Sequence, residues 1–288
     1  MLDRKAQNFA PGTIIFYRTM LSLFAKFCEA RAITTIDQIS PDELRRYLNW
    51  LEETGHNPGG IHAAYRAVKT FMRWLWDELE PEGKNPIEKV KAPRLAIEPL
   101  DPANLDDVGA MLAVCNSDFH GLRDKAIMLF LLDTGARAAE CLALDLDDCD
   151  LVTGAILIRV GKGRKPRTVF TGQKTRKALR AYLKLRHDTN PAVWVTAQGE
   201  RLGYVGLRAV MTRRAETAKV KPPELHSFRR AFALGMLRNG VDVYSLQSLM
   251  GHSDLQVLRR YLKQTDSDLA AAHRKGSPVD SMGGKNGR

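Results

Sequence analysis

The chain has 288 residues, of which 44% are hydrophobic and 27% charged, an ordinary globular composition that excludes wholesale disorder. Its length favours two domains. The longest apolar run, residues 126–132, is too short to span a bilayer, and the first residues lack the apolar core of a signal peptide. We therefore expect a cytoplasmic protein with reduced thiols, because its four cysteines lie too far apart for Cys-x-x-Cys metal or redox spacing.

Charge is unevenly distributed along the chain. Lys and Arg number 44 against 33 Asp and Glu, which gives a formal net charge of +11. Residues 1–96 carry a net charge of +2, residues 97–150 of −9 and residues 151–288 of +18. Such a basic segment is typical of proteins that bind a polyanion such as nucleic acid, although solubility charge or an anionic membrane surface gives the same pattern.

The first part of the chain predicts three helices. Residues 12–29 place an apolar stripe that includes Ile15 and Phe24 along one helical face. Ser40 is a good N-cap for a helix that ends near residue 53, because a proline and two acidic residues follow it. A third helix begins near Asn57 and has a basic row that is either a solvated surface or a set of phosphate contacts.

Residues 86–99 form the predicted linker between two domains. Three prolines stiffen this segment, and basic residues that include Lys91 and Arg94 suit a strap that lies along phosphates. The sequence thus predicts a helical DNA-binding domain over residues 1–85, a linker over 86–99, a second domain over 100–275 and a disordered tail over 276–288.

The second domain is expected to be helical with a small β-sheet. Helices are predicted over residues 105–115, 122–132, 136–144, 174–186, 204–218, 227–238, 242–250 and 254–262. Residues 154–160 and 167–171 predict two strands joined by a tight basic turn. The predicted fold class is therefore mainly α, with a helical first domain and a mixed second domain.

Several familiar chemistries have no signature here. The sequence has no P-loop, no G-x-G-x-x-G after a strand and no H-E-x-x-H. Seven histidines are scattered, and none has zinc-ligand spacing with a cysteine. We therefore expect no metal and no cofactor.

What remains is an ordered set of cations followed by a tyrosine. Taken singly, each has a plain structural explanation, such as a surface ion pair, a solvated turn, a helix cap or a core position. The set, with the sequence around each member, is Thr-Gly-Ala-Arg137-Ala-Ala-Glu140, Gly-Lys162-Gly, His226-Ser-Phe-Arg229, Gly-His252-Ser-Asp and Tyr261.

This order resembles the tyrosine recombinase (phage integrase) family over roughly residues 100–265, and the helical first part resembles the family's core-binding domain. The chain departs from the family at Arg230, where a histidine is common, and at Ala136 and Ala138, where larger residues are common. Neither change removes a charged catalytic group. Tyr244 is a rival nucleophile, but it precedes the Gly-His motif, where the resemblance implies no catalytic task.

The resemblance implies a site-specific recombinase or integrase that cleaves and rejoins DNA through a 3′-phosphotyrosyl intermediate and a Holliday junction. Attack by a tyrosine hydroxyl concentrates negative charge on the phosphate oxygens, which fixed donors must stabilise. Arg137, Arg229 and His252 take that role by resemblance, because guanidinium groups stay charged and donate in pairs.

Proton transfers complete the implied mechanism. Lys162 is the expected general acid for the 5′-hydroxyl leaving group, and His226 the expected acceptor of the Tyr261 proton. Glu140 is expected to orient Arg137 or His226 rather than to carry a proton.

The expected partners are double-stranded recombination sites and further copies of the chain, as a tetramer, with no membrane. Residues 266–273 form either a helix that docks into a neighbouring subunit or a plain C-terminal cap. Three alternatives stay open: a type IB topoisomerase or telomere resolvase, a DNA-binding regulator without chemistry, and a structural helical protein. The predicted phosphate contacts are Arg66, Lys69, Arg73, Lys91, Arg94, Arg164, Lys165, Arg167, Lys174, Arg176, Lys177, Arg213, Arg214, Lys219 and Lys221.

Overall fold

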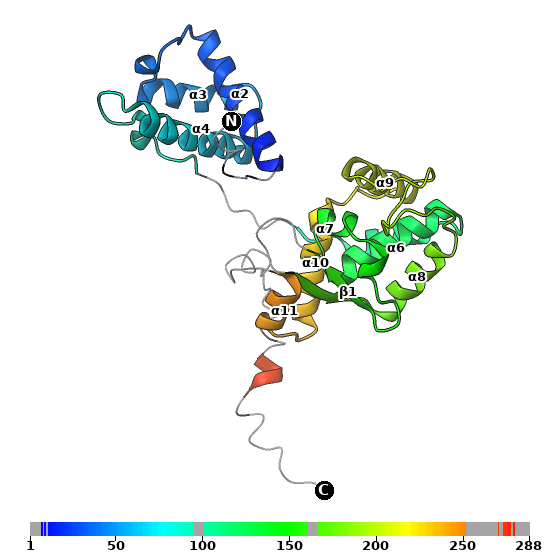
Figure 1. Ribbon diagram of the computed structural model, residues 1–288. Helices are drawn as coiled ribbons and strands as arrows, with labels where there is room; N and C mark the ends of the chain where they lie inside the picture. The colour runs from blue at the N-terminus through cyan, green and yellow to red at the C-terminus, as the bar shows by residue number, and fades with distance from the viewer. Residues whose placement is uncertain are drawn as a thin grey trace. The chain divides into compact units, whose positions relative to one another are not determined.

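The computed structural model describes residues 7, 9, 11–94, 101–159, 166–251, 270, 273–277 and 279 (Figure 1). The chain divides into two compact units, residues 1–98 and residues 99–288. Each unit has a hydrophobic core of its own, so the two are taken in turn.

The described part of unit 1 is built from three helices and two short 3₁₀ turns. The helices are α2 (Pro11–Ala30), α3 (Pro41–Glu53) and α4 (Pro58–Leu79), and the turns are η1 (Ile36–Gln38) and η2 (Pro86–Lys89). Ser40 and Asn57 cap α3 and α4 as predicted, since their side chains accept hydrogen bonds from the backbone N–H groups of Glu43 and Gly60. The caps satisfy donors that the first helical turn leaves open.

The unit 1 core forms where the three helices meet. Phe24 of α2, Leu51 of α3 and Met72 of α4 are buried in it. The predicted stripe on α2 is wrong in its first half, because Ile15 is 62% exposed. Only the second half of α2 buries residues in this core, at Phe24 and Phe27, so the apolar pattern runs further than the packing.

The segment after α4 belongs to unit 1. Ile87 of η2 and Val90 are buried in the unit 1 core, and the Tyr65 hydroxyl donates to the Val90 carbonyl at 2.8 Å. Asn85 Nδ2 donates to the Met72 carbonyl at 2.9 Å. The prediction of a linker from residue 86 is therefore wrong over residues 86–90, because two apolar side chains anchor them.

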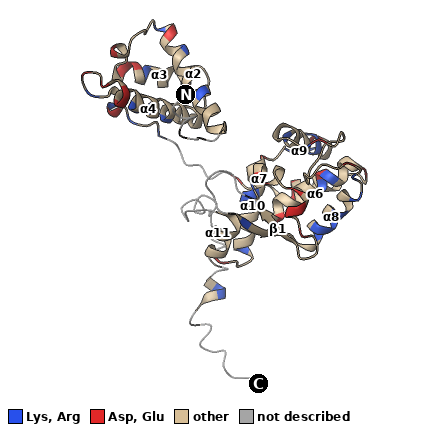
Figure 2. Cartoon of the chain, viewed as in Figure 1, with Lys and Arg blue, Asp and Glu red and all other residues tan. Residues whose placement is uncertain are grey.

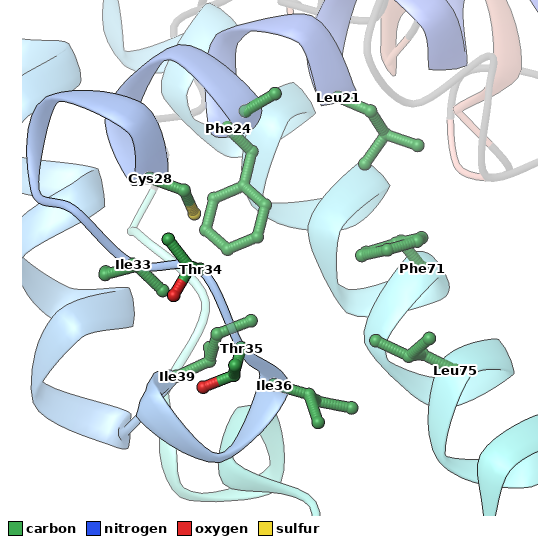
Figure 3. A pocket seen from close by; sticks show the side chains of 11 residues that line it. Leu21, Phe24, Cys28, Ile33, Thr34, Thr35, Ile36, Ile39, Phe71 and Leu75 are labelled. Atoms are coloured by element: carbon green, nitrogen blue, oxygen red, sulfur yellow. The ribbon is translucent and has the colours of Figure 1, made fainter.

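Unit 1 also contains an apolar pocket of about 430 Å³. Figure 3 shows Phe24 and Cys28 of α2 on one side of it and Phe71 and Leu75 of α4 on the other, with residues 33–36 and 39 completing the lining. Burial, with a smaller contribution from nearby glutamates, raises the pKa of the Cys28 thiol. The lining carries no basic side chain, so this pocket does not suit a phosphate.

Unit 2 is organised around one buried helix, α6 (Phe119–Thr134). It packs against α8 (Gln173–Leu183) and α10 (Leu225–Arg238), while α5 (Leu105–Ala113) packs against α9 (Tyr204–Ala218). Unit 2 also contains two short helices, α7 (Ala138–Leu142) and α11 (Val243–Met250), and the 3₁₀ turn η3 (Leu146–Asp148). Ile127 and Phe130 of α6 are fully buried, with Trp194 against the Phe130 ring.

The described part of unit 2 contains one small sheet. Strands β1 (Ala155–Ile158) and β2 (Arg167–Phe170) pair antiparallel, with Ala155 opposite Phe170 and Ile158 opposite Arg167. Both strands are shorter than predicted. The predicted turn over residues 161–166 lies outside the described residues except for its last residue. A mainly helical chain with a small sheet is nevertheless confirmed.

Helix predictions in unit 2 differ from the structure mainly at the ends. The helix over residues 204–218 matches α9 exactly in its bounds, and α6 begins three residues earlier than predicted because Asp118 caps it through the Gly121 N–H. The predicted helix over 254–262 lies outside the described residues. Among the helices described, none is both long enough and apolar enough to cross a membrane.

Candidate active site

A left-handed turn between α6 and α7 presents the first arginine of the site. Gly135 ends α6 with a φ of +60°, and a Cβ there would lie 2.3 Å from Cδ1 of Phe232. Only glycine fits both the backbone conformation and this close approach. The turn places Arg137 at the N-cap of α7, with 27% of its side chain exposed.

Glu140 holds Arg137 at two points. The Arg137 backbone N–H donates to Glu140 Oε2 at 2.9 Å, and Arg137 Nη1 donates to Oε1 at 2.8 Å. A glutamate three residues after an N-cap commonly satisfies the N-cap N–H. Here the same carboxylate also fixes the direction of the Arg137 guanidinium.

A second arginine, Arg167, completes the coordination of Glu140. Arg167 Nη1 donates to Oε1 at 3.1 Å and Nη2 to Oε2 at 2.7 Å, with both side chains 14% exposed. Burial alone raises the pKa of Glu140, but the hydrogen bonds and charges of Arg167 and Arg137 outweigh it and lower that pKa to about 2. Glu140 is therefore ionised at neutral pH and has no proton to give.

Arg229 joins three segments from inside unit 2. It lies on α10 and is 1% exposed. Its Nη1 donates to the Gly135 carbonyl at 2.5 Å and its Nη2 to the Met250 carbonyl at 2.6 Å. Arg229 thereby links α10 to the turn before Arg137 and to the last residue of α11.

His226 lies in the first turn of α10, near the arginines. Desolvation lowers its pKa most, and the positive charges of Arg230, Arg229 and Arg137 lower it further. Arg230, which stands where the family commonly has a histidine, is buried and donates to Glu224 Oε2 at 3.1 Å. His226 is accordingly neutral at neutral pH, the form that can accept a proton.

Three of the predicted catalytic residues, Lys162, His252 and Tyr261, lie outside the described residues, as do Arg164 and Lys165. The structure does place the elements that lead to them. Ile158 at the end of β1 and Arg167 at the start of β2 are paired, and they flank the segment that contains Lys162. Gly251 ends α11 with a φ of +63°, directly before His252. The rival nucleophile, Tyr244, is 72% exposed in the first turn of α11.

The predicted DNA contacts of unit 1 lie at its surface. Arg66 and Arg73 of α4 are exposed, and Arg73 Nε donates to Glu88 Oε1 at 2.8 Å. Lys69 places its ammonium 5.9 Å from the centre of the Tyr65 ring. The bases after η2, Lys91 and Arg94, are also exposed.

In unit 2, the basic residues divide into surface and buried groups. Lys174 is exposed in the first turn of α8, a helix with several basic residues (Figure 2). Arg213 is 54% exposed, but Arg214 is buried, and its Nε donates to the fully buried Asp124 at 2.9 Å. The prediction that Arg214 contacts DNA is therefore wrong, because it neutralises an internal carboxylate.

Arg167 is the site residue that the sequence did not identify. Its prediction as a phosphate contact is wrong, because Glu140 and the Leu249 carbonyl occupy its guanidinium. No local signal distinguishes it from its basic neighbours, since Glu140 lies 27 residues away in the chain.

Comparison with known proteins adds an independent line of information. Residues 104–268 match the phage integrase family, and residues 4–78 match the phage integrase N-terminal SAM-like domain. The tyrosine recombinase XerC of Pseudomonas syringae pv. tomato is 30% identical over 285 residues, which cover 96% of this chain and 93% of that protein. XerC of Oceanobacillus iheyensis is 30% identical over 293 residues, which cover 94% and 92%.

The fold is also similar to solved structures. One of them is the XerH site-specific recombinase bound to a palindromic difH substrate in a post-cleavage complex. It has a TM-score of 0.75 and 20% identity, and the match covers 96% of this chain and 82% of that one.

Proposed function

The chain belongs to the phage integrase family and is a tyrosine recombinase that acts on DNA, and on this premise we propose the chemistry of its site. Tyr261 attacks the scissile phosphate, and the product is a 3′-phosphotyrosyl link that stores the bond energy for religation. The observation that carries the proposal is that Arg229 is bonded to the turn before Arg137 and that the charges of both arginines act on a neutral His226.

The cleavage step balances with the residues of this chain. Tyr261 Oη forms a bond to phosphorus while the bond from phosphorus to O5′ of the next nucleotide breaks. His226 accepts the tyrosine proton, and Lys162 gives a proton to the departing 5′-hydroxyl. Religation reverses these transfers with the 5′-hydroxyl of the partner strand as the nucleophile.

The arginines stabilise the charge that develops during attack. Arg137 is the partly exposed member of the pair and donates to a non-bridging oxygen, while His252 donates to the same oxygens. Arg229, whose Nη1 and Nη2 are bonded to the Gly135 and Met250 carbonyls, adds a second fixed positive charge close to the turn before Arg137. Positive charge at this point also favours the phenolate form of Tyr261.

DNA is held by basic residues of both units. The residues that we assign to phosphate contact are Arg66, Lys69, Arg73, Lys91 and Arg94 of unit 1 and Arg164, Lys165, Lys174 and Arg213 of unit 2. Two duplexes are exchanged through a Holliday junction by a tetramer on paired sites. The relatives are named as recombinases, which favours strand exchange over relaxation of supercoils by a type IB topoisomerase.

A covalent trap tests the nucleophile. The protein is incubated in EDTA with a nicked suicide duplex that carries its site, and the products are separated on a denaturing gel. We expect a protein–DNA adduct with wild type and with Tyr244→Phe, and none with Tyr261→Phe, which should bind the duplex as wild type does. An adduct that persists in Tyr261→Phe would contradict the assignment, and a requirement for a divalent ion would contradict the mechanism.

A further inference from the structure

We infer that Arg167 is a positioning residue for cleavage, an inference that rests on the proposed function. Arg167 does not reach DNA. It fixes the Glu140 carboxylate, and through it the Arg137 guanidinium, against the end of α11 that leads to His252.

All three side-chain nitrogen atoms of Arg167 donate hydrogen bonds to groups within unit 2. Nη1 and Nη2 form a bidentate pair with the two oxygens of Glu140, and Nε donates to the Leu249 carbonyl at 2.9 Å. That carbonyl is in the last turn of α11, where a helix leaves its C=O groups without intrahelical donors. One planar fork thus connects the start of β2, the N-terminus of α7 and the C-terminus of α11.

Close packing reinforces the hydrogen bonds. A Cβ at Gly251 would lie 2.9 Å from Cδ of Arg167, so the turn that ends α11 rests directly on this side chain. Gly251 immediately precedes His252. Arg167 therefore packs against the residue that ends α11, one position before His252.

Each oxygen of Glu140 accepts from both arginines. Oε1 accepts from Nη1 of Arg137 and Nη1 of Arg167, and Oε2 accepts from the Arg137 backbone N–H and Nη2 of Arg167. Without Arg167, the Glu140 carboxylate would accept hydrogen bonds from Arg137 alone, and the Glu140 and Arg137 side chains could rotate together. A guanidinium displaced by about 1 Å can cost a reaction about 100-fold in rate.

Arg167 also preserves the charge that Arg137 offers to a phosphate. Arg137 and Glu140 alone would form a neutral pair. With Arg167 the cluster has a formal charge of +1, and its most exposed member is Arg137, at 27% against 14% for the other two side chains. The surplus positive charge is therefore directed toward the side from which substrate arrives.

The test is the single-turnover cleavage rate of the full chain on the nicked suicide duplex at saturating DNA. Arg167→Lys keeps the charge but loses the planar fork, because an ammonium cannot bind both Glu140 oxygens and the Leu249 carbonyl in this geometry. We expect the rate to fall 10- to 100-fold, with the DNA dissociation constant within about twofold of wild type. The matched control is Arg159→Lys at the end of β1, where the exposed Arg159 pairs with Asp148, and it should cleave at the wild-type rate.

A double variant separates positioning from simple structural support. If Arg167 acts through Glu140, Arg167→Lys combined with Glu140→Gln should cleave no more slowly than the slower single variant. Independent effects would multiply instead, and that result would overturn the inference. Wild-type cleavage by Arg167→Lys would overturn it as well.

A second perturbation covers the case in which Arg167→Lys does not fold. Gly251→Ala alters no charged group but pushes a Cβ into the Arg167 side chain. It should slow cleavage while DNA binding is kept, and an unchanged rate would count against the inference. Adduct formation by wild type reports separately on the proposed function, so the two failures are distinguishable.

Discussion

Replacing Glu140 by glutamine removes the one negative charge between Arg137 and Arg167 while keeping the shape of the side chain. The carboxylate accepts four hydrogen bonds from these two arginines, at 2.7 to 3.1 Å. A glutamine offers only one oxygen and turns an N–H₂ group toward one of the cations. Two partly buried guanidiniums would then share one site without a counter-ion, which is a costly arrangement.

The size of the effect follows from the pKa of Glu140. That pKa falls from an ordinary value of 4.5 to about 2 in the folded chain, which corresponds to roughly 3 kcal/mol of stability at neutral pH. Because the folded pKa is the lower one, this stability is complete above pH 4.5 and is lost as the pH falls toward 2. Between pH 6 and pH 3.5, the loss is about 1.4 kcal/mol.

Urea unfolding followed by tryptophan fluorescence measures this loss in unit 2. Trp194 is fully buried there, while the other three tryptophans belong to unit 1 and can be changed to phenylalanine in every variant compared. We expect Glu140→Gln to be less stable than its background by roughly 3 kcal/mol at pH 6. The difference in free energy of unfolding between the variant and its background should be about 1.4 kcal/mol smaller at pH 3.5.

Asp145→Asn is the matched control. The Asp145 side chain is 38% exposed and pairs with Arg201, which is 40% exposed, so water screens the pair and its loss should cost less than about 1 kcal/mol. A Glu140→Gln variant whose stability falls with acid as steeply as wild type would refute the reasoning. In that case Glu140 would not be the carboxylate that the two arginines hold ionised.

Two further stability changes follow from the fold of unit 2. Arg214→Ala should destabilise the chain by about 2 kcal/mol in urea unfolding, because the buried Asp124 loses a charged hydrogen bond and keeps the buried Arg123 and the distant Arg213 as ionic partners. The exposed Arg213, 3.7 Å from the same carboxylate, should cost less than about 1 kcal/mol on change to alanine, and equal losses would contradict the burial. Gly135→Ala should cost more than about 2 kcal/mol in the same assay, since its left-handed turn and the Phe232 ring leave no room for a Cβ, while Gly109→Ala in open helix should be neutral or stabilising.

Local signals explain why so much of the fold follows from the sequence. Ser40 and Asn57 cap their helices through hydrogen bonds to residues three positions away, which any reader of the sequence can see. Gly135 ends α6 for an equally local reason, its positive φ. Helix starts and stops of this kind depend on few residues, so their prediction succeeds.

Long-range partners explain what the sequence does not reveal. Arg213 and Arg214 are adjacent and chemically identical, yet the Arg213 side chain is 54% exposed whereas Arg214 is buried against Asp124, which lies 90 residues away in the chain. The role of Arg167 likewise depends on contacts with Glu140 and Leu249, 27 and 82 residues away. A basic residue is a good prediction for a phosphate contact only when its side chain is not paired with an internal carboxylate.

The linker boundary fails for a related reason. Prolines over residues 86–99 suggest an extended linker, but Ile87 and Val90 are buried in the unit 1 core and fix the first part of this segment. Two apolar side chains are a weak pattern in a sequence, although their burial stabilises the segment by about 1.5–3 kcal/mol each. Lys91 and Arg94 therefore lie within unit 1, directly after this anchored segment, which is a better position for contacting phosphate than the interior of a long linker.

The described site is a cation platform that the fold assembles from distant segments. Arg229 fixes the turn before Arg137 to the end of α11, and Arg167 fixes the same helix end to Glu140. None of these bonds requires a substrate, so the donors keep their positions before DNA arrives, and little reorganisation is needed when charge develops on the phosphate. The chain leaves this platform at β1 toward Lys162 and at Gly251 toward His252 and Tyr261. Cleavage should therefore be more sensitive to the hydrogen bonds within the platform than to any single phosphate contact at the surface.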